Sequence, residues 1–293
     1  MKLAAEARAK VNLAIDILHR REDGYHQLAM IAQSISLADR LVFTSRDRGI
    51  SLSCSDPDLD SGEGNLVLRA ARALQQLQPA ESRRGADIHL EKRIPVEAGL
   101  GGGSSDAAAT LLALNRLWGL GLSLQILSEI GFSLGADIPF CMQGGTALVE
   151  GVGEKVTPLP PFPSLPLVLV KPPFGLSTAQ VYRSLSLDGG LQRPDLPSLM
   201  AGIARGVAKE TFPFMVNVLE EGTGNRRGEI LSLKEELQAA GARKALMSGS
   251  GSVVFGFFQG REEAAGAASG FRSRGFWSQD VTVSPKGVEL QAL

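Results

Sequence analysis

Cysteine, histidine and excess charge are all scarce in this sequence. Its 293 residues include 2 cysteines, Cys54 and Cys141, and 3 histidines, and the formal net charge is -1. Neither cysteine has the paired spacing of a structural zinc site. The near-zero charge predicts neither nucleic acid nor an anionic membrane as the main partner. For the cysteines we favour two buried thiols in a reducing compartment over the alternative of a single disulfide.

Long apolar runs are also missing. No uninterrupted stretch approaches the roughly 20 residues that a membrane helix needs. The first residues, Met1–Glu6, lack the apolar core of a signal peptide. We therefore expect no membrane partner and a cytoplasmic location.

Length and patterning predict two domains and an α+β fold. A chain of 293 residues exceeds what one hydrophobic core usually serves. Prolines crowd residues 158–166 and oppose both helix and sheet, so we place a boundary there, with domains 1–160 and 161–293. Periodicity and capping residues predict strands at 11–18, 28–37, 40–44, 50–54, 88–92, 146–150, 167–171, 244–248, 252–258 and near 279–283, and helices at 65–77, 107–117, 123–134, near 229–240 and near 261–272.

Glycine, by contrast, is abundant and clustered. The densest cluster, Gly99–Gly103, is followed by Ser104, Ser105 and Asp106, which are residue types that cap helices, and then by a strong helix pattern. A helix N-terminus offers free N–H groups and the positive end of a dipole, and glycines let the backbone wrap a polyphosphate. The segment lacks the lysine of a P-loop and the third glycine of a Rossmann fingerprint. We interpret it as a phosphate-binding loop, with a plain glycine-rich turn as the alternative.

Three separated segments resemble the motifs of the GHMP kinases, named for galactokinase, homoserine kinase, mevalonate kinase and phosphomevalonate kinase. These segments are Ala9–Leu13, Pro95–Ala109 and Met247–Phe255. The resemblance implies a two-domain α+β fold, with an N-terminal α/β ATP-binding domain, a C-terminal ferredoxin-like α/β sandwich and the active site in the cleft between them. It also implies a small-molecule kinase that uses ATP and Mg²⁺.

Further segments narrow the resemblance to the GHMP kinases that act on a cytidine diphosphate-linked sugar alcohol in non-mevalonate isoprenoid synthesis. They are residues 10–13, 21–26, 135–140 and 144–147. The expected reaction is ATP-dependent phosphorylation of the 2-hydroxyl of that substrate, by a monomer or a homodimer. The chain departs from the family at Val218, where aspartate is usual, and we interpret this change as structural.

Two alternatives stay open beside this function. One is another GHMP kinase of the homoserine or mevalonate type, against which the Asp23–His26 turn argues. The other is a non-catalytic ligand sensor on the same fold, against which the retained Lys10 and Asp137 argue.

The resemblance assigns the catalytic roles to two residues and places a third beside them. Asp137 would accept the hydroxyl proton, and Lys10 would offset charge on the aspartate and the moving phosphoryl group. Asn12 would hydrogen-bond the substrate or hold the pair in place. Taken without the resemblance, Asp137 reads equally well as the cap of a short helix and Lys10 as an exposed edge-strand lysine.

The resemblance also implies where the ligands bind. Tyr25 and Tyr182 would sandwich the cytosine while His26 reads its edge, with packing on a helix face as the alternative for Tyr182. Lys92 lies near the nucleotide or is an exposed strand-end lysine, and Ser105 is a candidate Mg²⁺ ligand. The remaining expected contacts are, for ATP, Asn65, Pro95, Gly99, Leu100, Gly101, Gly102, Gly103, Ser104 and Ser105, and, for the substrate, Asn12, Thr178, Gly249 and Ser250.

Overall fold

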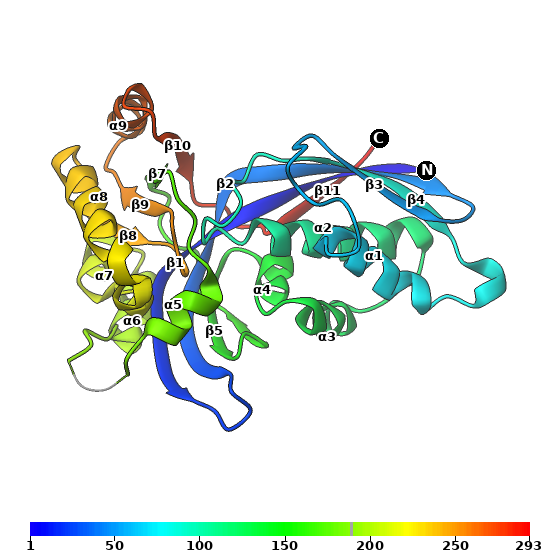
Figure 1. Cartoon of the computed structure of the whole chain (residues 1–293), viewed down its shortest axis with the longest axis horizontal. Helices are drawn as coiled ribbons and strands as arrows, with labels where there is room; N and C mark the ends of the chain where they lie inside the picture. Colours follow the sequence, from blue (N-terminus) through cyan, green and yellow to red (C-terminus); the bar gives the residue numbers. More distant parts are fainter. Residues whose placement is uncertain (188–189) are drawn as a thin grey trace.

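Two β-sheets, each packed against helices, form the framework of the protein (Figure 1). The computed structural model describes residues 1–187 and 190–293. In these ranges the first sheet contains β1 (Lys2–Arg20), β2 (His26–Arg46), β3 (Ile50–Cys54), β4 (Gly85–Glu91), β5 (Thr146–Gly151), β6 (Lys155–Pro158) and β11 (Val288–Ala292). Its order is β11-β1-β2-β4-β3, with β5 pairing to β2 and β6 to β5.

The long antiparallel pair of β1 and β2 is the axis of the first sheet. The expected strands 28–37 and 40–44 are one continuous strand, because pairing with β1 carries on through a register shift between Arg8 and Lys10. The two strands project together as a hairpin beyond the rest of the molecule (Figure 1). The glutamate-aspartate-glycine turn expected at 22–24 lies at its tip.

Helices cover one face of the first sheet. They are α1 (Leu66–Gln76), α2 (Gly102–Trp118), α3 (Leu124–Leu134) and α4 (Ile138–Gln143), with a 3-10 turn, η1, at Ala80–Ser82. The cap expected at Ser123 is confirmed, since its side chain accepts from the N–H of Ile126. Asn65, expected as the first residue of its helix, is the N-cap of α1 and accepts from the N–H of Val67.

One capping expectation is wrong. Helix α2 begins at Gly102, five positions earlier than expected, because Gly101 adopts the left-handed conformation (φ 69°) from which the helix starts. Ser104, Ser105 and Asp106 therefore lie inside the helix and do not cap it.

The second sheet is antiparallel and has the order β10-β7-β9-β8. Its strands are β7 (Pro166–Lys171), β8 (Lys244–Met247), β9 (Val254–Phe257) and β10 (Trp277–Thr282), and α8 (Arg227–Ala239) and α9 (Arg261–Ser273) pack on it. The predicted strands and helices of this half are confirmed within a few residues. The prediction missed α5 (Thr178–Ser184), α6 (Leu196–Arg205), α7 (Ala208–Thr211) and the 3-10 segments η2 (Phe212–Phe214) and η3 (Val218–Arg226).

The two sheets meet along the middle of β1. One hydrophobic cluster joins Val11 and Leu13 of β1 to Leu169 and Phe255 of the second sheet. The proline-rich segment at 158–166 separates the sheets in sequence, as expected, but β11 returns to pair with β1. The last strand thus belongs to the first sheet although it follows the second sheet in the sequence. For the remainder of the chain, the domain boundary between residues 160 and 161 stays a prediction. No helix in the described ranges has the length and apolar character to cross a membrane.

Candidate active site

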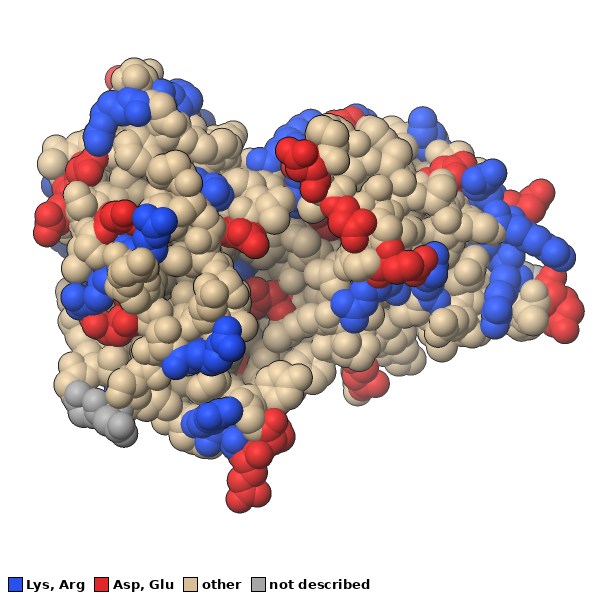
Figure 2. Space-filling model, in the orientation of Figure 1, with Lys and Arg blue, Asp and Glu red and all other residues tan. Residues whose placement is uncertain are grey.

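A cleft of about 1350 Å³ lies where the two halves of the molecule face each other. Figure 2 shows it as a hollow between the two halves. Its walls come from β1, the β1–β2 hairpin, the glycine loop, α5 and the turn after β8. Every site residue expected from the sequence lines this cleft except Ser105.

Lys10 and Asp137 face each other in the cleft. Lys10 is 4% exposed on β1, and its Nζ lies 2.7 Å from Asn12 Oδ1 and 3.5 Å from Asp137 Oδ2. Because β1 lies between β2 and β11, Lys10 is not an exposed edge-strand lysine. The buried ammonium is thus held between an amide oxygen and a carboxylate.

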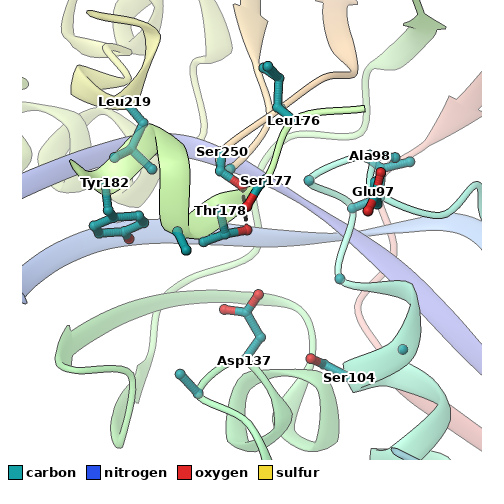
Figure 3. Close-up of a pocket in the computed structure, with 18 of the residues that line it drawn as sticks. Glu97, Ala98, Ser104, Asp137, Leu176, Ser177, Thr178, Tyr182, Leu219 and Ser250 are labelled. Atoms are coloured by element: carbon teal, nitrogen blue, oxygen red, sulfur yellow. Dashed lines mark hydrogen bonds between the residues drawn. The ribbon is translucent and has the colours of Figure 1, made fainter. Parts of the chain in front are cut away.

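Asp137 stands at the N-cap position of α4 but does not cap it. Its side chain makes no cap hydrogen bond; it is 32% exposed and points into the cleft opposite Thr178 (Figure 3). A carboxylate free of its own helix and open to a cleft is available to a ligand.

The glycine loop runs beside this pair. Gly99 and Gly101 have φ values of 71° and 69°, which side chains rarely adopt. A Cβ on Gly99 would lie 1.9 Å from the carbonyl oxygen of Ser248, and one on Gly101 would lie 3.1 Å from the Lys10 side chain. The glycines therefore let the backbone that opens α2 approach Lys10 closely, as a phosphate-binding helix N-terminus requires.

Ser105 is the one expected site residue that lies elsewhere. It is fully buried, and its Oγ donates to the carbonyl oxygen of Arg8 at 2.7 Å and lies 3.3 Å from Cys141 Sγ. One residue along a helix turns the side chain by about 100°, so Ser104 lines the cleft (Figure 3) and Ser105 faces β1. The position of its side chain therefore argues against the expectation that Ser105 binds ATP and Mg²⁺.

The two cysteines are free thiols, so the disulfide alternative is excluded. Cys141 is buried, and burial raises the pKa of its thiol to about 12, which keeps it protonated. We had also expected both thiols to be buried. This is confirmed for Cys141 but is wrong for Cys54, which is half-buried.

A buried charge cluster that the sequence did not reveal anchors the glycine loop. Lys92 Nζ bonds Asp39 and lies 2.8 Å from Asp106 Oδ2. Asp39 Oδ1 also accepts from the N–H groups of Arg93 and Ile94, at 2.5 and 2.8 Å. These contacts connect the residues that precede the glycine loop with the first turns of α2. The cluster therefore holds both ends of the glycine loop in place. Lys92 is thus a buried lysine and not an exposed strand-end residue.

This cluster predicts a pH dependence of stability. Burial first, and then the charge of Asp39, raise the pKa of Asp106 from 3.8 to about 8, against the opposing effect of Lys92. The folded state therefore keeps a proton that the unfolded chain loses, and its stabilisation declines as the pH rises from about 4 to about 8. Urea unfolding across this range should show a flatter profile for Asp106→Asn than for the wild type. Parallel profiles would contradict the assignment.

At the far end of the cleft lie the three rings that the resemblance assigns to the cytosine, and two of them contact each other. The rings of His26 and Tyr182 lie 5.2 Å apart, tilted by 50°, whereas Tyr25 is 67% exposed at the hairpin. Burial, and then the positive charge of Arg20, lower the pKa of His26, while burial and then Asp137 raise that of Tyr182. Both rings are thus neutral near pH 7, and the exposed Tyr25 side chain lines the cleft beside them.

The turn after β8 closes the cleft opposite the glycine loop. Ser248 Oγ donates to the Gly99 carbonyl oxygen at 2.9 Å, and the N–H of Val253 donates to that of Ala98 at 3.2 Å. Ser250 Oγ lies 2.8 Å from Thr178 Oγ1 at the start of α5, a contact drawn in Figure 3. The two glycine-containing loops, one from each half of the chain, are therefore joined directly.

The prediction also missed five charged residues that line the cleft, namely Arg20, Asp60, Glu97, Asp106 and Arg183. Arg20 directly precedes the segment 21–26 that carried the family resemblance, so its position was a usable signal. Arg183 lies next to Tyr182, but α5 itself was not predicted, and Glu97 gave no signal beyond its place in the glycine loop.

Comparisons with known proteins agree with this geometry. Residues 65–145 match the family model described as GHMP kinases N terminal domain, and residues 192–275 match that described as GHMP kinases C terminal. The chain is 46% identical over 273 residues to the 4-diphosphocytidyl-2-C-methyl-D-erythritol kinase of Pelotomaculum thermopropionicum, covering 93% of this chain and 94% of that one. It is also 46% identical to the enzyme of that name from Geobacter metallireducens, covering 94% and 96%.

Solved structures give the same result. A crystal structure of 4-(cytidine 5'-diphospho)-2C-methyl-D-erythritol kinase aligns with a TM-score of 0.82 at 37% identity, covering 96% of this chain and 99% of that one. Homoserine kinase from Cytophaga hutchinsonii shares the fold, with a TM-score of 0.77 at 20% identity over 99% of this chain and 97% of that one. The chain therefore belongs to the 4-diphosphocytidyl-2-C-methyl-D-erythritol kinase family, a family of small-molecule kinases with the GHMP kinase fold.

Proposed function

We propose that this protein transfers the γ-phosphoryl group of ATP to the 2-hydroxyl of 4-diphosphocytidyl-2-C-methyl-D-erythritol, giving the 2-phosphate and ADP in isoprenoid precursor synthesis. The main support is the 3.5 Å separation of Lys10 Nζ and Asp137 Oδ2 beside a glycine loop that opens a helix into the same cleft. A base, a cation and a phosphate-binding backbone in one cleft are the parts that phosphoryl transfer needs.

The positions of these groups support the following reaction. Asp137 accepts the proton of the substrate hydroxyl, whose oxygen attacks the γ-phosphorus while the bond to the β-phosphate oxygen breaks. Lys10 lies close enough to Asp137 to offset negative charge on the carboxylate and on the moving phosphoryl group. Asn12 Oδ1 accepts from Lys10 Nζ and holds the ammonium in place.

The backbone that opens α2 would bind the triphosphate. Gly101, Gly102 and Gly103 line the cleft at the N-terminus of α2, where N–H groups and the helix dipole favour an anion. Asn65 and Leu66 border the cleft beside this loop, and we place the adenine on their side.

Mg²⁺ fits this site as an ion carried by ATP. The described residues form no group of three or more acidic, histidine or cysteine ligands around a single point. Mg²⁺ in kinases is usually held by one or two protein oxygens together with substrate phosphates. Ser104 lines the cleft in the first turn of α2 and is the side chain that would hold it. When bound, the ion would neutralise phosphate charge.

A coupled ADP-release assay with a panel of alcohols tests the proposed function. Turnover is expected with the cytidylyl substrate and not with homoserine or mevalonate. Turnover of either of these, without turnover of the cytidylyl substrate, would point to another GHMP kinase. No turnover of any alcohol, together with retained nucleotide binding, would favour the sensor alternative. The cytoplasmic location, the monomeric or homodimeric state and the expectation of no nucleic-acid partner stay predictions.

Tyr25→Ala tests the cytosine end of the cleft. Loss of stacking on the order of 1–3 kcal/mol per base should raise the KM for the cytidylyl substrate much more than the KM for ATP. Tyr25→Phe is the matched control, because it keeps the ring and removes only the hydroxyl, and its KM values should stay close to wild type. Equal increases in both KM values for Tyr25→Ala would count against this assignment.

A further inference from the structure

Asn217 links the turn after β8 to the segment that precedes η3. The residue is 3% exposed, and its Nδ2 donates to the carbonyl oxygens of Met247 and Gly249 at 2.9 and 2.8 Å. Its Oδ1 accepts from the N–H of Leu219 at 3.0 Å. Every polar atom of this side chain thus serves to hold backbone.

The same segment is bonded to the catalytic strand. The N–H of Ile15 on β1 donates to the carbonyl oxygen of Val216 at 2.9 Å, and β1 carries Lys10 and Asn12. Glu220 adds a further contact, because its Oε1 accepts from the N–H of Met247 at 2.9 Å. The segment therefore connects β1 with the end of β8.

The turn held by Asn217 lies against the reacting groups. A Cβ on Gly249 would be 3.4 Å from Lys10 Nζ and 3.0 Å from the carbonyl oxygen of Gly99. Gly249 and Ser250 both line the cleft. A shift of this turn would consequently move backbone next to Lys10 and the glycine loop.

We propose that Asn217 is a positioning residue for phosphoryl transfer, which sets the place of the Gly249–Ser250 turn relative to Lys10. It touches neither substrate nor nucleotide, and it acts through the two carbonyl oxygens that it holds. Val218, which replaces the aspartate usual in the family, is 2% exposed in the hydrophobic core, so the polar function of this run falls to Asn217 and Glu220. The inference rests on the proposed function, because it concerns the rate of that reaction.

Asn217→Ala should lower kcat by about 10²-fold, the loss that a misplacement of about 1 Å can cause. The Kd of a non-hydrolysable ATP analogue should change by no more than a few-fold, because the glycine loop keeps its own anchors. Thr223→Val is the matched control. Thr223 is 4% exposed in η3 and its Oγ1 donates to the Glu220 carbonyl oxygen, but it does not line the cleft, so its kcat should stay near wild type.

The experiment measures kcat, both KM values, analogue binding and urea unfolding for the wild type and each variant. Should Asn217→Ala not fold, Asn217→Ser carries the test, because its smaller side chain leaves room for water at the two carbonyl oxygens. A folded Asn217 variant with kcat close to wild type overturns the proposal, and so does an equal loss of kcat in Thr223→Val. A wild-type protein that does not phosphorylate the cytidylyl substrate would instead refute the proposed function.

Discussion

Asp137→Ala is expected to lower the turnover number by about 10²–10⁴-fold, the usual contribution of a positioned general base. The KM values for ATP and for the cytidylyl substrate should change by no more than a few-fold, because the phosphate loop and the cytosine end do not depend on this carboxylate. The side chain makes no cap hydrogen bond to α4, but its removal leaves the buried Lys10 ammonium with Asn12 as its partner, so some loss of stability is expected beside the loss of turnover. Steady-state kinetics and urea unfolding measure the two effects separately.

Asp195 offers a matched control for this experiment. It stands at the N-cap of α6, as Asp137 does at that of α4, but its side chain accepts from the N–H of Ser198 and it does not line the cleft. Asp195→Ala should therefore lower stability and leave turnover unchanged. Wild-type turnover in Asp137→Ala would remove this residue from the mechanism.

The sequence predicted the starts of those helices that begin at a side chain able to cap them. Asn65 and Ser123 mark the starts of α1 and α3, because each side chain satisfies an N–H group of the first helical turn. The start of α2 was predicted wrongly because this helix has no side-chain cap. Here the conformation of Gly101, and not a side chain, begins the helix, and the serines that looked like caps serve other purposes.

Long-range pairing could not be predicted in this way. The return of β11 to β1 joins residues 3 and 292, and neither segment signals the other. The proximity of Lys10 and Asp137 likewise followed from the family resemblance and not from spacing along the chain. What the resemblance could not show was the orientation of neighbouring side chains, which is why Ser104 and Ser105 were both expected to contact ATP although only Ser104 lines the cleft.

The cluster of Lys92, Asp39 and Asp106 is the clearest example of this limit. Asp39 lies on β2, Lys92 directly follows β4, and Asp106 lies in α2. In the sequence alone, each has an ordinary interpretation: Asp39 as a strand residue, Lys92 as a strand-end lysine and Asp106 as a helix cap. Only the fold brings the three charges together. They are nearly inaccessible, with side-chain exposures of 7% for Lys92, 0% for Asp39 and 3% for Asp106.

Lys92→Met should consequently destabilise the protein by about 3–5 kcal/mol, the usual cost of removing one partner from a buried ion pair. The substitution keeps most of the apolar stem and leaves the buried side chains of Asp39 and Asp106 without their cation. Urea unfolding near neutral pH measures the loss. Lys155 on β6 is exposed, and Lys155→Met is the control, expected to stay within about 0.5 kcal/mol of wild type.

The destabilisation should also depend on pH and on Asp106. With the ammonium gone, burial and Asp39 act on Asp106 unopposed, so its carboxyl group should keep its proton to a higher pH. The part of the cost of Lys92→Met that depends on Asp106 should therefore grow as the pH rises above about 8, where Asp106 ionises beside Lys92 in the wild type but stays protonated in the variant. Adding Asp106→Asn should remove this pH dependence for the same reason. A loss that is small, independent of pH and unaffected by Asp106→Asn would show that Lys92 does not compensate these two buried side chains.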